Sequence, residues 1–162
     1  MLRKMLYCIA FCSSISGCGL LAPAPEPAAP RAALSPERAE ALMQALLALG
    51  VDYHYGGNSP ATGFDCSGLV AHVYRQAWGI QLPRTSAAQS RVGVPVGLSE
   101  LQAGDLVFYD TLHQPFSHVG IYLGDGKFVH APRTGARVRI ESLQGEYWTK
   151  RFNGARRIQP ET

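Results

Sequence analysis

The sequence of 162 residues has no apolar run long enough to cross a bilayer, and it has little net charge. The apolar stretch over residues 5–15 is too short for a membrane-spanning helix. With 46% hydrophobic and 17% charged residues, the composition is typical of a folded domain rather than a disordered chain. The net charge is +3, and Arg3 and Lys4 near the N-terminus supply two of these charges. The remaining charge of about +1 gives no reason to expect a nucleic-acid partner.

Cysteine is scarce, with four residues in the chain, and three of them lie among the first eighteen residues. Residues 1–17 combine Arg3 and Lys4, a short apolar region and a small-residue end, which is typical of a secretory signal peptide. Ile15-Ser16-Gly17-Cys18 resembles a bacterial lipobox, whose cysteine is lipidated and becomes the mature N-terminus. The alternative is an ordinary signal peptide in which Cys18 is incidental. We therefore predict a lipoprotein signal peptide at 1–17 and lipidation of Cys18.

Residues 18–34 follow as a tether, because Pro23, Pro25, Pro27 and Pro30 among alanines prevent both helix and sheet. One compact domain is expected over residues 35–162. Gly19 is not the aspartate that favours inner-membrane retention in Gram-negative lipoproteins. We therefore expect anchoring in the outer membrane, facing the periplasm.

Cys66 is then the single thiol of the mature domain, in a compartment that oxidises thiols. It has no partner for an intramolecular disulfide. Such a thiol is either buried and inert or has a chemical role, and the cysteine count alone leaves both possibilities open.

Helical periodicity dominates the first half of the domain, and strand patterns dominate the second half. A helix is expected from the N-cap Ser35 to a stop at Gly50, and another from Asp65 or Cys66 to Gly79. For the first helix we expect these apolar residues to face the core: Ala39, Leu42, Met43, Leu46 and Leu49. Further elements are expected as short helices at 85–89 and 146–151 and strands at 105–109, 118–123, 127–130, 137–140 and 154–158. This order indicates an α+β fold with an antiparallel sheet.

The hairpin over residues 118–130 carries two histidines, and its register decides whether they meet. A two-residue turn pairing Gly124 with Lys127 throughout would put His118 and His130 on opposite faces. A three-residue loop with a bulge pairs Leu123 with Lys127 and puts both histidines on one face. The second register collects the apolar residues of both strands on the other face, so we predict it.

Cys66 is expected to be reactive, because Phe64-Asp65-Cys66-Ser67-Gly68 stands where a loop becomes a helix. Unpaired backbone N–H groups and the helix dipole favour a thiolate at this position. A nearby histidine would lower its pKa further, toward the range of about 3.5–7.5 found for catalytic cysteines. The backbone N–H of Cys66 also offers a hydrogen bond to an oxyanion.

Five blocks together resemble the NlpC/p60 family of cell-wall cysteine peptidases, over about residues 42–157. They are Asp65-Cys66-Ser67-Gly68, Leu82-Pro83-Arg84-Thr85-Ser86, Gly104-Asp105-Leu106-Val107-Phe108, Ser117-His118-Val119-Gly120-Ile121-Tyr122 and Phe128-Val129-His130-Ala131. With the lipoprotein signal in front, the layout is most similar to small lipoprotein murein endopeptidases of Gram-negative bacteria. The resemblance implies a papain-like α+β fold, in which the nucleophile helix packs on the sheet that carries the histidines.

The resemblance also implies the roles of individual residues. Cys66 is the nucleophile, His118 is the general base, and His130 holds the His118 ring. Tyr53 helps to bind the oxyanion or the substrate. The implied reaction passes through a thioester acyl-enzyme and needs no metal or organic cofactor.

Other positions carry less specific expectations. Asp65 and Ser67 match residues that line the substrate groove in relatives, and Arg84 is either a contact for a substrate carboxylate or structural. The C-terminal third is basic, which means either solvated element edges or attraction to an anionic substrate. The residues concerned are Lys127, Arg133, Arg137, Arg139, Lys150, Arg151, Arg156 and Arg157.

The expected substrate is the peptide part of peptidoglycan, acted on by a monomer held at the membrane through its lipid. The bond stays open among the D-alanyl–diaminopimelate cross-link, the γ-D-glutamyl–diaminopimelate bond and a carboxypeptidase trim. Two alternatives are a cysteine amidase or acyltransferase on another substrate and a non-catalytic wall-binding lipoprotein. A zinc site from His113, His118 and His130 is a third, but its spacing matches no common zinc motif.

Overall fold

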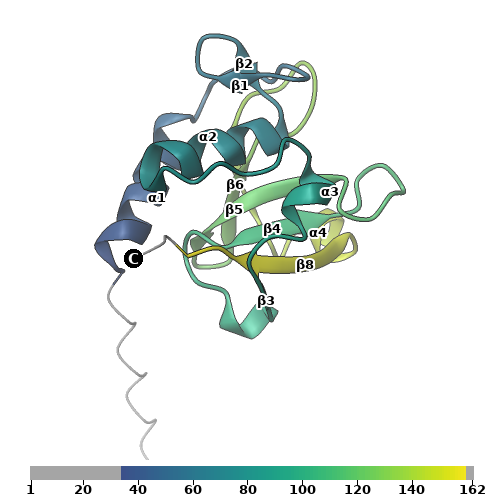
Figure 1. Ribbon diagram of the computed structural model, residues 1–162. Coiled ribbons are helices and arrows are strands. Elements are labelled where there is room, and N and C mark those ends of the chain that lie inside the picture. The colour runs from purple at the N-terminus through teal and green to yellow at the C-terminus, as the bar shows by residue number, and fades with distance from the viewer. Residues whose placement is uncertain (1–33, 160–162) are drawn as a thin grey trace, which may run out of the picture. The chain divides into compact units, whose positions relative to one another are not determined.

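A computed structural model describes residues 34–159 of the chain (Figure 1). The signal peptide predicted at 1–17, the lipidation site Cys18 and the tether before Leu34 lie outside the described residues. Within the described part, none of the helices has the length and apolar character needed to cross a bilayer.

Helix α1 spans Pro36–Leu47, and Ser35 caps it as predicted by accepting a hydrogen bond from the backbone N–H of Arg38. The predicted buried face was wrong. Met43 and Leu46 are 54% and 42% exposed. The buried residues are instead Ala41, Ala45 and Ala48. The periodicity was helical, but small alanine side chains occupy the face that packs on the neighbouring helix, where they allow a close approach.

Helix α2 spans Cys66–Trp78, with Asp65 as N-cap and Gly79 in the left-handed conformation at its end, as the sequence predicts. Its residues Leu69, Val70 and Val73 are fully buried. Both α1 and α2 pack on the same side of the sheet (Figure 1). The N-terminus of α2, where Cys66 stands, is directed toward the first residues of a central strand.

Six antiparallel strands form the main sheet in the order β3-β8-β4-β5-β6-β7. They are β3 Val94–Val96, β4 Leu106–Tyr109, β5 His118–Gly124, β6 Lys127–His130, β7 Arg139–Ser142 and β8 Phe152–Arg157. The α+β class and the antiparallel sheet are confirmed. The strand predicted at 137–140 lies two residues later in the chain, and β3, which contains Pro95 at the sheet edge, was not predicted.

The remaining elements are short and connect these layers. They are β1 Asn58–Ser59, β2 Gly63–Phe64, α3 Ser86–Gln89, the 3₁₀ turn η1 Leu98–Glu100 and α4 Glu146–Thr149. Strands β1 and β2 form a separate two-stranded hairpin just before Cys66. The predicted helices at 85–89 and 146–151 correspond to α3 and α4.

The hairpin of β5 and β6 has the predicted pairing around the histidines. Ile121 pairs with Val129, which brings His118 and His130 to the same face of the sheet. The bulge lies elsewhere than expected, because a two-residue turn at Asp125-Gly126 pairs Gly124 with Lys127 and the register shifts within β5. The predicted and the observed hairpin each contain one extra residue, at different places. His118 and His130 therefore lie on the same face in both.

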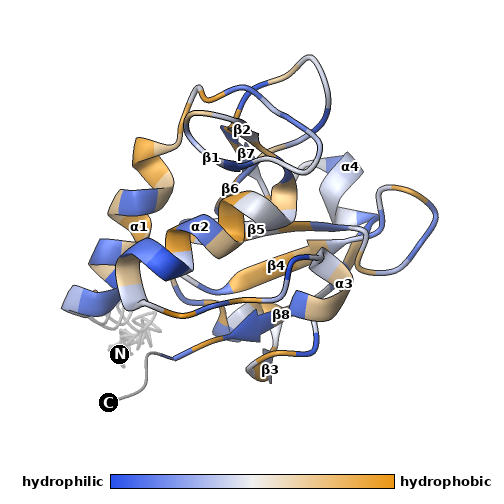
Figure 2. Ribbon diagram, turned by 45° about the horizontal axis from the view of Figure 1, so that its top comes forward, coloured by the Kyte–Doolittle hydropathy of each residue, from blue (hydrophilic) through white to orange (hydrophobic). Residues whose placement is uncertain are grey.

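Two apolar clusters cover the two faces of the sheet. The larger one contains residues of α1 and α2 with Val119, Ile121 and Val129. The smaller one contains Tyr109, Phe128 and Trp148. Figure 2 shows the hydrophobic strand β4 beneath α2, between these clusters. Cys66 packs against the first cluster, whereas the His118 ring lies beside Tyr109 and Trp148 of the second.

Candidate active site

The Cys66 thiol lies at the first turn of α2 against the first residues of β5. The backbone N–H groups of Val119, Ser67 and Cys66 itself are directed at its sulfur. The Val119 N–H belongs to the peptide that joins His118 to Val119, so the thiol rests on the backbone of the candidate base. Within residues 34–159, the groups that act most strongly on the pKa of this thiol, besides its burial, are these backbone N–H groups and the Asp65 carboxylate.

Burial raises the pKa of the Cys66 thiol to about 11. The Val119 N–H and the free N–H groups of the helix start lower this pKa, which is the sign predicted from the sequence. Burial outweighs them, and the nearby Asp65 carboxylate raises the pKa further. The expectation of a thiolate in the free protein is therefore wrong, and the thiol is neutral at pH 7.

His118 and His130 form a buried pair across the β5–β6 hairpin. The Nε2 atom of His118 lies 2.8 Å from Nδ1 of His130, and their rings are nearly perpendicular. His118 is 4% exposed and His130 is fully buried. Trp148 stacks on the His118 ring with 5.6 Å between centroids. These contacts leave Nδ1 of His118 as the ring nitrogen available to accept a proton.

Both imidazoles are neutral at physiological pH. Burial lowers the pKa of His118 to about 3, and the neighbouring His130 contributes to this shift. Burial also lowers the pKa of His130 to about 3, with Arg139 acting in the same direction. The free protein therefore holds both the Cys66 thiol and the His118 imidazole in their neutral forms.

Glu141 of β7 is a residue that the sequence reasoning missed. Its Oε1 atom lies 3.5 Å from Nε2 of His130, outside hydrogen-bond geometry, and it would form an ion pair only with a protonated imidazole. Arg139 and the indole N–H of Trp148 hold the same carboxylate. A carboxylate accepts hydrogen bonds and favours the proton of His130 on the nitrogen that faces it. The remaining nitrogen of His130 then accepts from Nε2–H of His118, which leaves Nδ1 of His118 unprotonated.

Asp65 connects three segments around the thiol. Its carboxylate accepts hydrogen bonds from Gly68 N at 2.7 Å and Gly56 N at 2.9 Å. Arg84 binds it in a bidentate manner, with Nη1–Oδ1 and Nη2–Oδ2 distances of 3.0 and 2.6 Å. Ser67 donates a further bond from its hydroxyl at 3.1 Å. Although burial alone would raise it, the bonds from Arg84 and Gly68 lower the pKa of the Asp65 carboxyl. The Arg84 guanidinium thus has a structural partner in this site.

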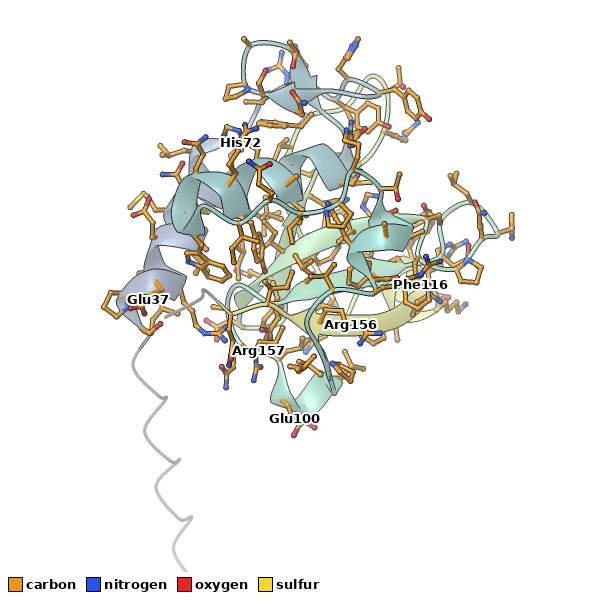
Figure 3. All side chains as sticks on the ribbon, viewed as in Figure 1. Glu37, His72, Glu100, Phe116, Arg156 and Arg157 are labelled. Atoms are coloured by element: carbon orange, nitrogen blue, oxygen red, sulfur yellow. The ribbon has the colours of Figure 1, made fainter. Side chains whose placement is uncertain are left out.

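Two hollows border the candidate pair. The Cys66 hollow, of about 500 Å³, is lined by Tyr53, Asp65, Cys66, Ser67, Arg84 and Phe116 among others. Phe116 lies on the loop after β4 and stacks edge-on against Phe108 (Figure 3). The His118 hollow, of about 390 Å³, lies on the other side of Leu112, which lines both. Tyr53 is half-buried, and burial raises the pKa of its hydroxyl, which stays a hydrogen-bond donor.

Most of the basic residues in the C-terminal third have structural partners. Arg157 binds the buried Asp105 at 2.7 Å, on the side of the domain away from β1 and β2 (Figure 3). Arg137 pairs with Asp52 and Lys150 with Glu146. The remaining contacts are Arg139 with Glu141 and Arg151 over the Tyr147 ring.

The described residues contain no group of three side chains suited to holding a metal ion. His113 was one of the three histidines weighed as zinc ligands in the sequence analysis. It lies in the loop between β4 and β5, has a positive φ and is exposed. The other two histidines, His118 and His130, are in contact and form a hydrogen-bonded pair.

A helix that presents a thiol at its N-terminus and packs on an antiparallel sheet bearing a histidine pair defines the papain-like class of folds. Residues 50–157 match the NlpC/P60 family. The chain belongs to this family.

Named relatives and solved structures agree with this assignment. Murein DD-endopeptidase MepH of Escherichia coli is 46% identical over 113 residues, which are 68% of this chain and 42% of MepH. The Escherichia coli protein named Murein DD-endopeptidase MepS/Murein LD-carboxypeptidase is 44% identical over 67% of this chain and 56% of its own length.

Among solved structures, an NlpC/P60 family protein of Bacillus cereus superposes with a TM-score of 0.69 at 37% identity, covering 74% of this chain and 39% of that one. The NlpC/p60 domain of the peptidoglycan hydrolase SagA gives 0.66 at 32% identity, covering 75% and 98%.

The chain spans about half or less of the length of the curated relatives it matches. The family match, over residues 50–157, includes Cys66, His118 and His130.

Proposed function

We propose that this protein is a peptidoglycan hydrolase, a cysteine endopeptidase that cleaves amide bonds in cell-wall stem peptides or cross-links. The observation that carries the proposal is the thiol of Cys66 resting on the His118–Val119 peptide, next to a buried pair of histidines. Its relatives bear the names of murein endopeptidases.

In the proposed mechanism, Cys66 is the nucleophile and His118 the general base. As sulfur attacks the amide carbonyl, its proton passes to Nδ1 of His118 and the S–C bond forms. His118 returns that proton to the leaving nitrogen, and the C–N bond breaks. Water then cleaves the thioester by the reverse sequence, which restores the thiol.

Because the thiol and the imidazole are both neutral in the free protein, charge develops during the attack. The N–H groups of Cys66 and Ser67 at the helix start stabilise the negative charge as it passes from sulfur to the carbonyl oxygen. Tyr53 lines the same hollow and supplies a further donor for that oxygen or for the substrate.

His130 and Glu141 act as positioning residues in this proposal. Glu141 keeps the His130 proton on Nε2, His130 accepts from His118, and Nδ1 of His118 is thereby kept free to accept the thiol proton. Asp65, Ser67 and Arg84 shape the hollow that receives the acyl part of the substrate.

The cellular setting belongs to the same proposal. Lipidation of Cys18 anchors the protein, with the periplasmic face of the outer membrane as its place, and the tether lets a monomeric domain reach the wall. Labelling with a palmitate analogue, compared between wild type and Cys18→Ala, tests the anchor.

The activity is tested by digesting purified sacculi with the wild-type protein and with Cys66→Ala, followed by mass spectrometry of the released muropeptides. We expect new peptide ends with the wild type and none with the variant, while both show the same thermal unfolding midpoint. Activity retained by Cys66→Ala would refute the mechanism, and the masses identify which of the three candidate bonds is cut.

A further inference from the structure

The His118 hollow is lined by aromatic rings and by an arginine that has no ion pair within residues 34–159. Trp148 and Tyr147 form apolar walls, and Trp148 stacks on His118. Two arginines, Arg133 and Arg139, line the same space of about 390 Å³. This volume suits a small ligand or a single amino-acid residue of a larger one.

The reaction itself assigns the two hollows to the two halves of a peptide. The acyl half becomes bonded to sulfur, so it occupies the Cys66 hollow. The leaving amine takes its proton from His118, so the leaving half occupies the space beside that imidazole. This assignment rests on the proposed function.

Among the described residues, the charged groups that line the His118 hollow include one cation without an ion pair. Arg139 is bound to Glu141, whose carboxylate also accepts from Trp148. His118 is neutral, because burial lowers its pKa to about 3. Arg133 is exposed and has no ion pair within residues 34–159. A guanidinium fork in this setting matches the planar geometry of a carboxylate.

We propose that the His118 hollow is the leaving-group subsite and that Arg133 binds a carboxylate on the amine-bearing residue. All three candidate bonds release an amine that carries a carboxylate, either diaminopimelate or D-alanine. Arg133 thus selects substrates whose leaving residue is a free acid over those in which the same carboxyl is an amide.

The test uses two muropeptide dimers that differ in the diaminopimelate carboxyl of the leaving half, as free acid or as carboxamide. For the wild type we expect kcat/KM to be about tenfold higher on the free acid, as for one charged hydrogen bond at a partly hydrated site. In Arg133→Gln the preference falls to about onefold, because activity on the acid drops by more than activity on the amide.

Arg137→Gln is the matched control, since Arg137 is 70% exposed on the same segment and pairs with Asp52 outside the hollow. It is expected to keep the wild-type preference. An Arg133→Gln variant that still prefers the free acid, or a wild type without preference, overturns the inference and leaves the proposed function intact. Cleavage of neither dimer by the wild type overturns both.

Discussion

Replacing Asp65 by asparagine tests how far one carboxylate holds the site together. In the wild type, Oδ2 accepts from Gly56 N and Arg84 Nη2, while Oδ1 accepts from Gly68 N, Arg84 Nη1 and Ser67. Asparagine keeps one acceptor oxygen. In its better orientation the new NH₂ replaces Oδ2 and faces two donors, so two hydrogen bonds are lost.

The magnitude follows from the exposure of these two donors. Gly56 is exposed, so water can reach its N–H, and the loss of this bond costs about 0.5–1.5 kcal/mol, the net contribution of an ordinary hydrogen bond. Arg84 is 44% exposed, so water replaces much of its lost contact and this part adds about 0–1 kcal/mol. We expect Asp65→Asn to lower the free energy of unfolding by about 1–2 kcal/mol in urea denaturation at pH 7.

The stabilisation that the Asp65 carboxylate provides should also depend on pH. Hydrogen bonds lower the pKa of Asp65 in the folded state, so its stabilisation is present above the unfolded pKa of about 3.9 and is lost as pH falls through the folded value. The gap between wild type and Asp65→Asn should persist from pH 7 to 5 and narrow below about pH 4.

Asp52→Asn is the control, because Asp52 is 76% exposed in its pair with Arg137 and should cost no more than about 0.5 kcal/mol. A gap for Asp65→Asn below about 0.5 kcal/mol, or one that stays constant into acid, would refute the reasoning.

Three further predictions concern the site. Alkylation of Cys66 by iodoacetamide should accelerate about tenfold per pH unit from pH 7 to 10, because burial raises its pKa to about 11; a plateau near pH 7 would contradict this. Glu141→Gln should lower kcat with KM nearly unchanged, by no more than the roughly 10²–10⁴-fold that general-base catalysis supplies, and an unaltered kcat would rule out its positioning role. Gly68→Ala should destabilise the domain by about 1–3 kcal/mol in urea, since its Cβ would stand 2.0 Å from the Gly57 carbonyl oxygen. Equal or greater stability of this variant would show that the contact relaxes freely.

Local patterns in the sequence predicted the parts of the fold that local rules govern. The limits of α2 followed from a capping Asp65 and a left-handed Gly79. The meeting of His118 and His130 followed from apolar alternation, because a slip of one residue would have turned Val129 away from the core.

The parts that failed depend on tertiary packing. Glu141 reaches His130 from a strand that the sequence placed two residues too early, so no local signal pointed to the contact. The thiol pKa was wrong because the helix start acts locally, whereas burial of Cys66 depends on the sheet beneath it. Periodicity identified α1, but it did not reveal that Ala41 and Ala45 form the packing face.

Cys66 and His118 pack against different apolar clusters, and this affects how the substrate preference of such a protein can evolve. The Cys66 hollow is lined by the start of α2, the turn before it and α3, whereas the His118 hollow is lined by α4, β7 and the segment after β6. The loop between β4 and β5 borders both hollows. Substitutions in the elements that line only one hollow leave the lining of the other unchanged. Preference for each half of a cleaved peptide can therefore diversify separately on a constant scaffold.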